Sequence, residues 1–254
     1  SIGRDLVAMC VDDLVCAGAA PLFFLDYLAV GRLDPDAAES LVAGIADGCA
    51  EAGCALIGGE MAEHPGVMAA DQFDLVGFAV GAVERDALLD GTAAVAGDVL
   101  VGIESPNLRS NGFSLARRLA FDVAGRSLDD PAWEGASTTL ADEMLAPSVI
   151  YAPAVVAALA AHEIHAVAHV TGGGLPGNLP RVMDNTLDAV VDRSTWEVPR
   201  FFCELQNMGD VSDDEMERVF NMGLGMVLAV PDRDSDAVVA MLASHDRPAR
   251  VVGE

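Results

Sequence analysis

Along the first part of the chain, some segments have apolar residues at helical spacing and others are nearly continuous apolar runs. The alternation of these two patterns predicts the order of the elements. Apolar residues at helical spacing predict helices, and nearly continuous apolar runs bounded by glycine or proline predict buried strands. Two helices, three strands and one polar loop are predicted in this way, the helices at 4–17 and 35–52, the strands at 21–30, 55–57 and 73–83, and the loop at 61–72. The last of these strands is expected to be buried on both faces. Gly18 and Gly53 are expected to end the two helices, and Asp34 with Pro35 to begin the second.

The rest of the chain repeats this mixture after a loop-like stretch near 85–90. Further strands are predicted at 99–103, 165–169, 189–191, 225–230 and 249–252, and further helices at 111–124, 153–161, 174–183, 199–208, 212–219 and 235–244. Helices and strands that alternate along a chain are typical of α/β proteins, here with mixed sheets of α+β character. We therefore predict two domains, residues 1–87 and 88–254.

The charge balance is strongly acidic. Forty Asp and Glu residues stand against fourteen basic residues, all of them Arg, so the formal net charge is −26. This field would repel nucleic acid and anionic membranes, although it also fits adaptation to a salty cytoplasm. The longest apolar run is shorter than the roughly 20 residues of a membrane helix, and no basic-then-apolar leader opens the chain. Five cysteines without a CxxC pair predict free thiols in a reducing cytosol, so we expect a cytoplasmic protein that binds neither nucleic acid nor membrane.

Four carboxylates stand out in the first part of the chain. Asp12 and Asp13 lie side by side on the first predicted helix, Asp26 interrupts an apolar strand, and Glu60 follows a glycine pair at a predicted strand end. An acid within an apolar strand usually has a partner or a cation, and Mg²⁺ prefers such oxygen ligands. The alternative is that these are solvated helix acids and an ordinary turn.

Two glycine-containing loops in the second part could bind anions. His169 and Thr171 precede Gly172–Gly174, where a strand runs into a predicted helix whose N–H groups could receive a phosphate; His169 could equally be a satisfied core histidine. The other loop contains Arg109, Ser110, Asn111 and Gly112, and its alternative interpretation is an ordinary cap and turn. A further asparagine, Asn221, lies in a later tight turn.

Five segments occur in an order and spacing that resemble the phosphoribosylformylglycinamidine cyclo-ligase family, also called the aminoimidazole ribonucleotide synthetases. They are VAMCVDDLVCAGAAPLFFLDY, LIGGEMAEHPG, SNGFSL, HVTGGGLPGNLPRV and FNMGLGM. The resemblance runs from Ile2 to the last predicted strand. PLFFLDY and the GGE segment favour this family over its superfamily relatives selenophosphate synthetase, thiamine-monophosphate kinase and formylglycinamidine amidotransferase.

The resemblance implies a two-domain synthetase that uses ATP and Mg²⁺ in purine (IMP) biosynthesis. In such an enzyme ATP phosphorylates the formyl amide oxygen of formylglycinamidine ribonucleotide. The amidine nitrogen then attacks that carbon, and phosphate leaves as the imidazole ring closes. Phosphoryl transfer of this kind depends mostly on positioning and charge neutralisation. The resemblance also implies a homodimer that pairs through its amino-terminal domains.

Residue roles follow from the same resemblance. It implies catalytic roles for Asp13, His169 and Arg109, and Mg²⁺ coordination by Asp13 and Glu60. The residues expected at the ATP phosphates or lining the cleft are Gly58, Gly59, Glu60, Thr171, Gly172, Gly173 and Gly174. The residues expected nearer the ribonucleotide are Ser110, Asn111, Gly112 and Asn221.

The chain departs from the family pattern in several places. The family's lysine-bearing DGVGTK segment is not found, so the first domain is expected to be incomplete and the chain inactive by itself. Asp12, Arg109 and Val149 stand where the family has Asn, His and Arg. These departures keep two alternatives open: a catalytically silent nucleotide-binding homologue, and a sister ATP-dependent kinase or synthetase.

Overall fold

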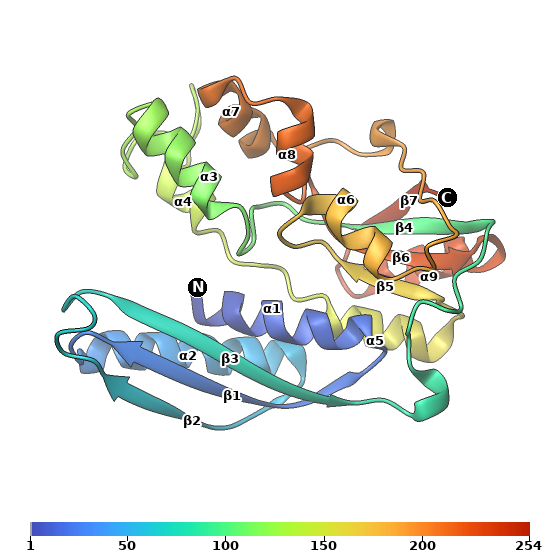
Figure 1. The fold of residues 1–254 in the computed structure, drawn as a ribbon, viewed down its shortest axis with the longest axis horizontal. Helices are drawn as coiled ribbons and strands as arrows, with labels where there is room; N and C mark the ends of the chain where they lie inside the picture. Colours follow the sequence, from blue (N-terminus) through green and yellow to red (C-terminus); the bar gives the residue numbers. More distant parts are fainter. Residues whose placement is uncertain (1) are drawn as a thin grey trace. The chain divides into compact units, whose positions relative to one another are not determined.

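The computed structural model describes residues 2–254 and divides them into two compact units (Figure 1). Unit 1 holds the chain up to Leu88 together with Val149–Val156, and unit 2 holds Leu89–Ser148 and Ala157–Glu254. The single domain boundary predicted between residues 87 and 88 does not account for Val149–Val156, where the chain returns to unit 1. Both units mix helices with one β-sheet, so the predicted α/β class with mixed sheets is confirmed.

Unit 1 is a three-stranded sheet with helices on one face. Its elements are α1 (Ile2–Cys16), β1 (Ala20–Val30), α2 (Pro35–Ala52), β2 (Ala55–Glu63), β3 (Phe73–Ala82) and the 3₁₀ turn η1 (Arg85–Ala87). The strand order is β2-β1-β3, with β1 parallel to β2 and antiparallel to β3. Both α1 and α2 lie on the same side of this sheet (Figure 1).

The ends of α2 are fixed by the residues that the sequence indicates. The Asp34 side chain accepts hydrogen bonds from the main-chain N–H groups of Asp36 and Ala37, and Pro35 takes the first helical position. Gly53 ends the helix with a left-handed φ of 71°, a conformation that glycine adopts without a Cβ penalty.

Two predictions for unit 1 are wrong. Strand β2 does not stop at Ile57 but continues to Glu63, into the first residues of the predicted loop, because it follows β1 in parallel register past a bulge opposite Phe24/Leu25. Strand β3 is not buried on both faces: Val76 is 48% and Phe78 62% exposed, since helices cover only one face of the sheet.

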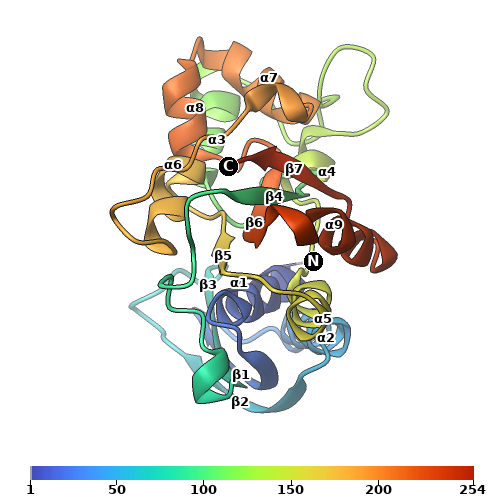
Figure 2. The ribbon, with the colours of Figure 1, turned by 90° about the vertical axis from the view of Figure 1, so that its right-hand side faces the viewer.

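Unit 2 is built on an antiparallel sheet of order β5-β6-β4-β7 (Figure 2). Its strands are β4 (Asp98–Glu104), β5 (Ala166–His169), β6 (Leu224–Pro231) and β7 (Ala249–Gly253). Its helices are α3 (Phe113–Arg117), the π-helix η2 (Arg118–Val123), α4 (Leu140–Met144), α6 (Gly174–Asn178), α7 (Arg200–Gly209), α8 (Asp213–Val219) and α9 (Ser235–Ser244), with 3₁₀ turns η3 (Leu179–Arg181), η4 (Arg193–Thr195) and η5 (Asp232–Asp234). Helix α5 (Ala152–Ala161) begins in unit 1 and ends in unit 2.

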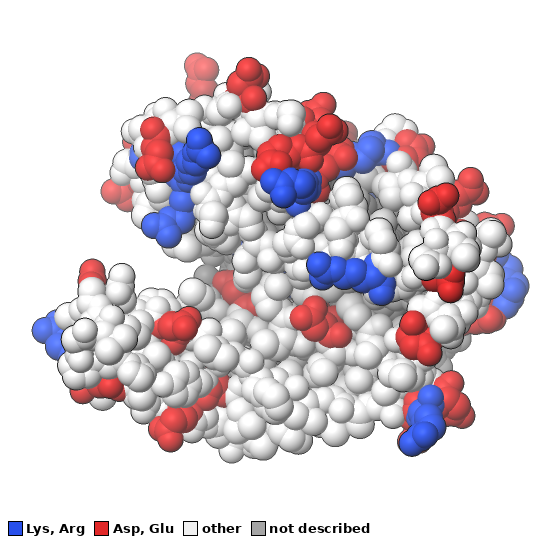
Figure 3. Space-filling view, viewed as in Figure 1, with Lys and Arg blue, Asp and Glu red and all other residues white. Residues whose placement is uncertain are grey.

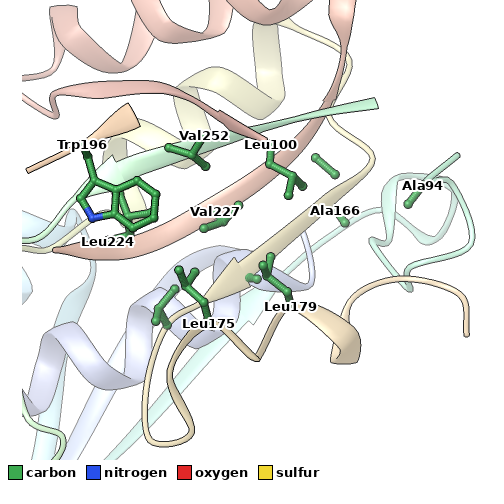
Figure 4. Packing of buried hydrophobic residues seen from close by; sticks show 12 residues of the cluster. Ala94, Leu100, Ala166, Leu175, Leu179, Trp196, Leu224, Val227 and Val252 are labelled. Carbon is green, nitrogen blue, oxygen red and sulfur yellow. The ribbon is translucent and has the colours of Figure 1, made fainter. Parts of the chain in front are cut away.

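One core cluster of unit 2 packs α6 and η3 against the sheet. Leu224 and Val227 of β6 meet Leu175 and Leu179 below them, and the Trp196 indole closes one end (Figure 4). The indole Nε1 donates to the main-chain oxygen of Met222 at 2.9 Å, which satisfies the polar atom of a buried side chain.

Three predictions for unit 2 are corrected. The helix expected at 174–183 is only α6 followed by η3, because Pro180 has no N–H to continue an α-helical ladder. The helix expected at 111–124 begins at Phe113 and changes to π-geometry at Arg118. The segment 189–191 is no strand, since only Val191 forms an isolated bridge, to Gly253.

On the face shown in Figure 3, acidic side chains lie on both units and are densest over α8. Within residues 2–254, no helix combines the length and the apolar character that a bilayer span requires.

Candidate functional site

Asp12 is a structural residue of unit 1. Its side chain is fully buried, and Oδ1 accepts hydrogen bonds from the N–H groups of Tyr151 and Ala152, each at 2.9 Å. These N–H groups open α5, where the first turn of a helix leaves donors unsatisfied and the helix dipole favours a negative charge. Asp12 therefore holds Val149–Val156 in unit 1. No local pattern indicates this contact, because the partners of Asp12 are 139 and 140 positions away.

The four acids of unit 1 do not form one cluster. Asp13 is exposed on α1. Asp26 faces the helix layer, because its strand partner Gly77 lies so close to α1 that a Cβ there would be 2.9 Å from Cys10 Sγ. A Cβ at Gly59 would overlap the Asp26 carboxylate, so Gly59 shares that face, and Glu60 points to the other one.

This arrangement corrects the predicted position of Glu60, which lies inside β2 and not at a strand end. An open hollow of about 470 Å³ follows the edge of β2 and is lined by both Asp26 and Glu60. Burial raises the pKa of the Asp26 carboxyl, whereas its main-chain hydrogen bond lowers it to a lesser degree. Within residues 2–254, no group of three or more His, Cys, Asp or Glu side chains could hold a metal ion by itself.

In unit 2 the structure brings Arg109 and His169 into direct contact. Arg109 Nη1 lies 2.6 Å from His169 Nε2, and the two residues are only 3% and 6% exposed. His169 ends β5, where it pairs with Met226 of β6. Arg109 has a left-handed φ of 56°, which is uncommon for a residue with a side chain and typical of functional sites.

Asn111 ties the loop that carries Arg109 to the glycine loop. Its Oδ1 accepts a hydrogen bond from Gly172 N at 3.1 Å, and Gly174 N donates to Thr171 O at 3.1 Å. Two main-chain N–H groups expected to receive a phosphate thus have partners within unit 2. The α6 helix that follows has only five residues, whereas phosphate binding by the glycine loop stays a prediction. Asn178 holds the loop from the other side through its Nδ2, 2.8 Å from Gly174 O.

The remaining predicted residues of the Arg109 loop have different environments. Ser110 is exposed and does not cap α3; Gly112 takes the cap position with a φ of 80°. A Cβ at Gly112 would overlap the Phe220 ring, so only glycine fits there.

Asn221 holds Asn107, which in turn holds the main chain of Arg109. Asn107 was not identified from the sequence. Asn221 Nδ2 donates to Asn107 O at 2.8 Å, and its Oδ1 accepts from Gly223 N at 2.8 Å. Asn107 Oδ1 in turn accepts from Arg109 N at 3.0 Å. Asn107 is two positions before Arg109, a spacing typical of an asparagine turn, and that signal could have identified it.

A larger hollow of unit 2, about 560 Å³, lies elsewhere. It is lined mainly by apolar side chains, with the Arg193–Glu217 ion pair at 3.2 Å. Of the predicted site residues only Asn221 reaches it, and neither Arg109 nor His169 lines it.

A second titratable cluster surrounds His165. Its Nδ1 lies 2.7 Å from Asp98 Oδ2 and its Nε2 lies 3.0 Å from Glu163 Oε1. Burial alone would lower the pKa of His165, but the hydrogen bonds and charges of the two carboxylates outweigh it and raise that pKa. Since both ring nitrogens are occupied, this histidine ties β4 to the start of β5.

The chain is similar to proteins of known name over nearly its whole length. Two family models of AIR synthase related proteins match the chain, the N-terminal domain over residues 1–83 and the C-terminal domain over residues 95–254. The phosphoribosylformylglycinamidine cyclo-ligase of Geotalea daltonii is 48% identical over 254 residues, which are 100% of this chain and 73% of that protein. The enzyme of the same name from Trichlorobacter lovleyi is 48% identical, with 100% and 72% covered.

Solved structures show the same fold at low identity. Hydrogenase maturation protein HypE in complex with ATP has a TM-score of 0.73 at 21% identity and covers 100% of this chain and 70% of its own. Thiamine-monophosphate kinase from Stenotrophomonas maltophilia has a TM-score of 0.71 at 22% identity, with 99% and 76% covered. With two family models that together match nearly the whole chain and close relatives of one name, the chain belongs to the phosphoribosylformylglycinamidine cyclo-ligase family of AIR synthase related proteins.

Proposed function

We propose that this protein closes the imidazole ring of formylglycinamidine ribonucleotide in an ATP-dependent reaction of purine biosynthesis, with release of ADP and phosphate. The observation that carries the proposal is the 48% identity with a cyclo-ligase over the whole chain. The alternative of a sister kinase has weaker support, since the thiamine-monophosphate kinase structure is only 22% identical.

Unit 2 supplies a suitable polar centre. Arg109 and His169 are in contact, and Asn111 fixes the glycine loop beside them. A buried cation and an imidazole suit a reaction in which negative charge builds up on transferred oxygens. We propose that Arg109 and His169 act on the reacting groups, that Thr171–Gly174 form a wall of the site, and that Ser110, Asn111 and Gly112 lie nearer the ribonucleotide. Asn221, whose amide nitrogen and oxygen each make a hydrogen bond within unit 2, supports them.

The carboxylates of unit 1 are of the ligand type that Mg²⁺ prefers, and Asp13 and Glu60 would act at different points of a nucleotide-bound ion, because they lie on opposite sides of the sheet. No group of three ligating side chains is present within residues 2–254, and Mg²⁺ is usually held by only one or two carboxylates, several waters and substrate phosphates. Asp13 is exposed and would hold the ion on the helix side. Glu60, with Gly58 and Gly59, would face the nucleotide from the β2 edge. Bound Mg²⁺ would neutralise phosphate charge.

The exposed face of the unit 1 sheet supports a homodimer. Val76 and Phe78 alternate on the face that α1 and α2 leave open, opposite Tyr27 and Leu25 in register. An apolar sheet face of this kind is typical of a protein–protein interface. If a second copy covers it, Phe78→Asp should convert a dimer to monomers in sedimentation analysis. Val67→Asp, at a loop residue that is 84% exposed, should not.

The net charge of −26 disfavours polyanionic partners, so we propose small-molecule substrates and no nucleic acid. The cytoplasmic location stays a prediction.

The direct test is the formation of aminoimidazole ribonucleotide from formylglycinamidine ribonucleotide, ATP and Mg²⁺ by the purified protein. ATP binding without product would instead favour the silent homologue, and the same assay tests whether the chain is inactive by itself. Asp13→Ala should lower kcat by about 10²-fold or more. Asp236→Ala, at an exposed acid of α9, should leave kcat unchanged. Wild-type turnover in Asp13→Ala would remove Asp13 from the site.

A further inference from the structure

The contact between Arg109 and His169 leaves the imidazole one protonation state. The guanidinium group has only N–H donors and stays protonated at any relevant pH. At 2.6 Å from Arg109 Nη1, His169 Nε2 must therefore be the acceptor and carry the lone pair. A second positive charge on the ring would face the guanidinium in a place where both residues are nearly fully buried. The ring is then neutral, with its proton on Nδ1.

The main chain of Arg109 is held in place independently of this contact. Its N–H donates to Asn107 Oδ1, and Asn107 Nδ2 donates to Pro147 O at 2.9 Å. Asn221 adds a third anchor at Asn107 O. These hydrogen bonds stabilise the left-handed φ of Arg109, which lies in the loop after β4.

His169 is equally fixed. It is the last residue of β5, in register with Met226, and the next residue, Val170, donates from its N–H to Gly225 O at 3.0 Å. Because both backbones are anchored in the same unit, the distance between the two side chains cannot relax easily.

We infer that Arg109, in addition to the direct role proposed above, positions His169 by locking it as the neutral Nδ1–H tautomer. The tautomer of His169 does not depend on the proposed function. Only its consequence for catalysis rests on that proposal. In the ring closure, His169 would donate a hydrogen bond from Nδ1 and keep its proton, and Nε2 could not serve as a base while Arg109 occupies it. A catalytic imidazole depends on which nitrogen carries the proton, so the exchange of the pattern's histidine for Arg109 sets the role of this group.

The test reads the tautomer directly. In protein labelled with ¹⁵N at its five histidines, His169 should show a protonated Nδ1 and an unprotonated Nε2. Arg109→Gln replaces the donor-only group by an amide that can donate or accept, so the His169 signals should shift toward the Nε2–H form. Arg109→Lys keeps a donor-only cation and should restore the wild-type pattern. Arg118→Gln, at an exposed residue of η2, is the matched control, and the other four histidines report whether each variant is folded.

Activity gives the second readout. Arg109→Gln should lower kcat by about 10-fold or more with KM changed less than about threefold, and Arg109→Lys should recover most of kcat. An Nε2–H or doubly protonated His169 in the wild type, or an unchanged tautomer in Arg109→Gln, would overturn the inference. The spectra do not depend on turnover, so an inactive protein with the expected tautomer would count against the proposed reaction and leave the lock standing.

Discussion

Removal of the Asp12 carboxylate should destabilise the protein strongly, although Asp12 belongs to a pair of acids that resembles a metal site. In Asp12→Ala the main-chain N–H groups of Tyr151 and Ala152 would lose their acceptor in a fully buried position. A hydrogen bond to a charged group contributes about 1.5–3 kcal/mol, and a helix cap about 0.5–2 kcal/mol. For two bonds that share one carboxylate, we expect a loss of about 3–5 kcal/mol in the free energy of unfolding.

Two further variants separate the possible causes. Asp12→Asn keeps an oxygen acceptor for both N–H groups and loses the charge that favours a helix N-terminus, so it should cost about 1 kcal/mol. Asp13→Ala, at the exposed neighbour, should change the free energy of unfolding by less than about 0.5 kcal/mol while it removes activity.

Thermal and urea unfolding, followed by circular dichroism, measure these differences. A loss of this size lowers Tm by about 10 °C in a chain of this length, since each kcal/mol corresponds to about 2–4 °C. Hydrogen exchange should be faster at the start of α5 in Asp12→Ala than in the wild type. A loss below about 1 kcal/mol, or unchanged exchange at Tyr151 and Ala152, would refute a structural role for Asp12.

Two other predictions concern pH and close packing. Because its pKa is raised on folding, His165 stabilises the protein fully below its unfolded pKa of about 6.5, and this contribution is lost as pH rises through the higher folded pKa. The Tm advantage of the wild type over His165→Gln should therefore shrink from about pH 6 to pH 8, and an advantage that grows with pH would contradict this sign. Gly174 has a φ of 60°, and in Gly174→Ala the new Cβ would overlap the main chain of α8, so this variant should lower the free energy of unfolding by more than about 3 kcal/mol. The control is Gly172→Ala, whose Cβ would meet only an amide oxygen at 3.6 Å and which should be nearly neutral in stability.

The sequence by itself determined the local elements and the family. Apolar periodicity placed both helices of unit 1, and Asp34 and Gly53 marked the ends of α2, because capping acts within a few residues. The motif order around Asp13, Gly58–Glu60 and Thr171–Gly174 also identified the cyclo-ligase family, which the relatives confirm. These signals are local, so they can be recognised in the sequence without knowledge of the fold.

Only the tertiary structure decided what the polar residues do. The sequence shows Asp12 beside Asp13, yet one is buried against the start of α5 and the other is exposed, since burial depends on a segment far away in the chain. It likewise shows Arg109 and His169 sixty positions apart, and their contact arises because β4 and β5 both pair with β6. Strand pairing and helix packing are long-range, so the contact of His169 with Arg109 and the separate faces of Asp26 and Glu60 follow from the fold alone.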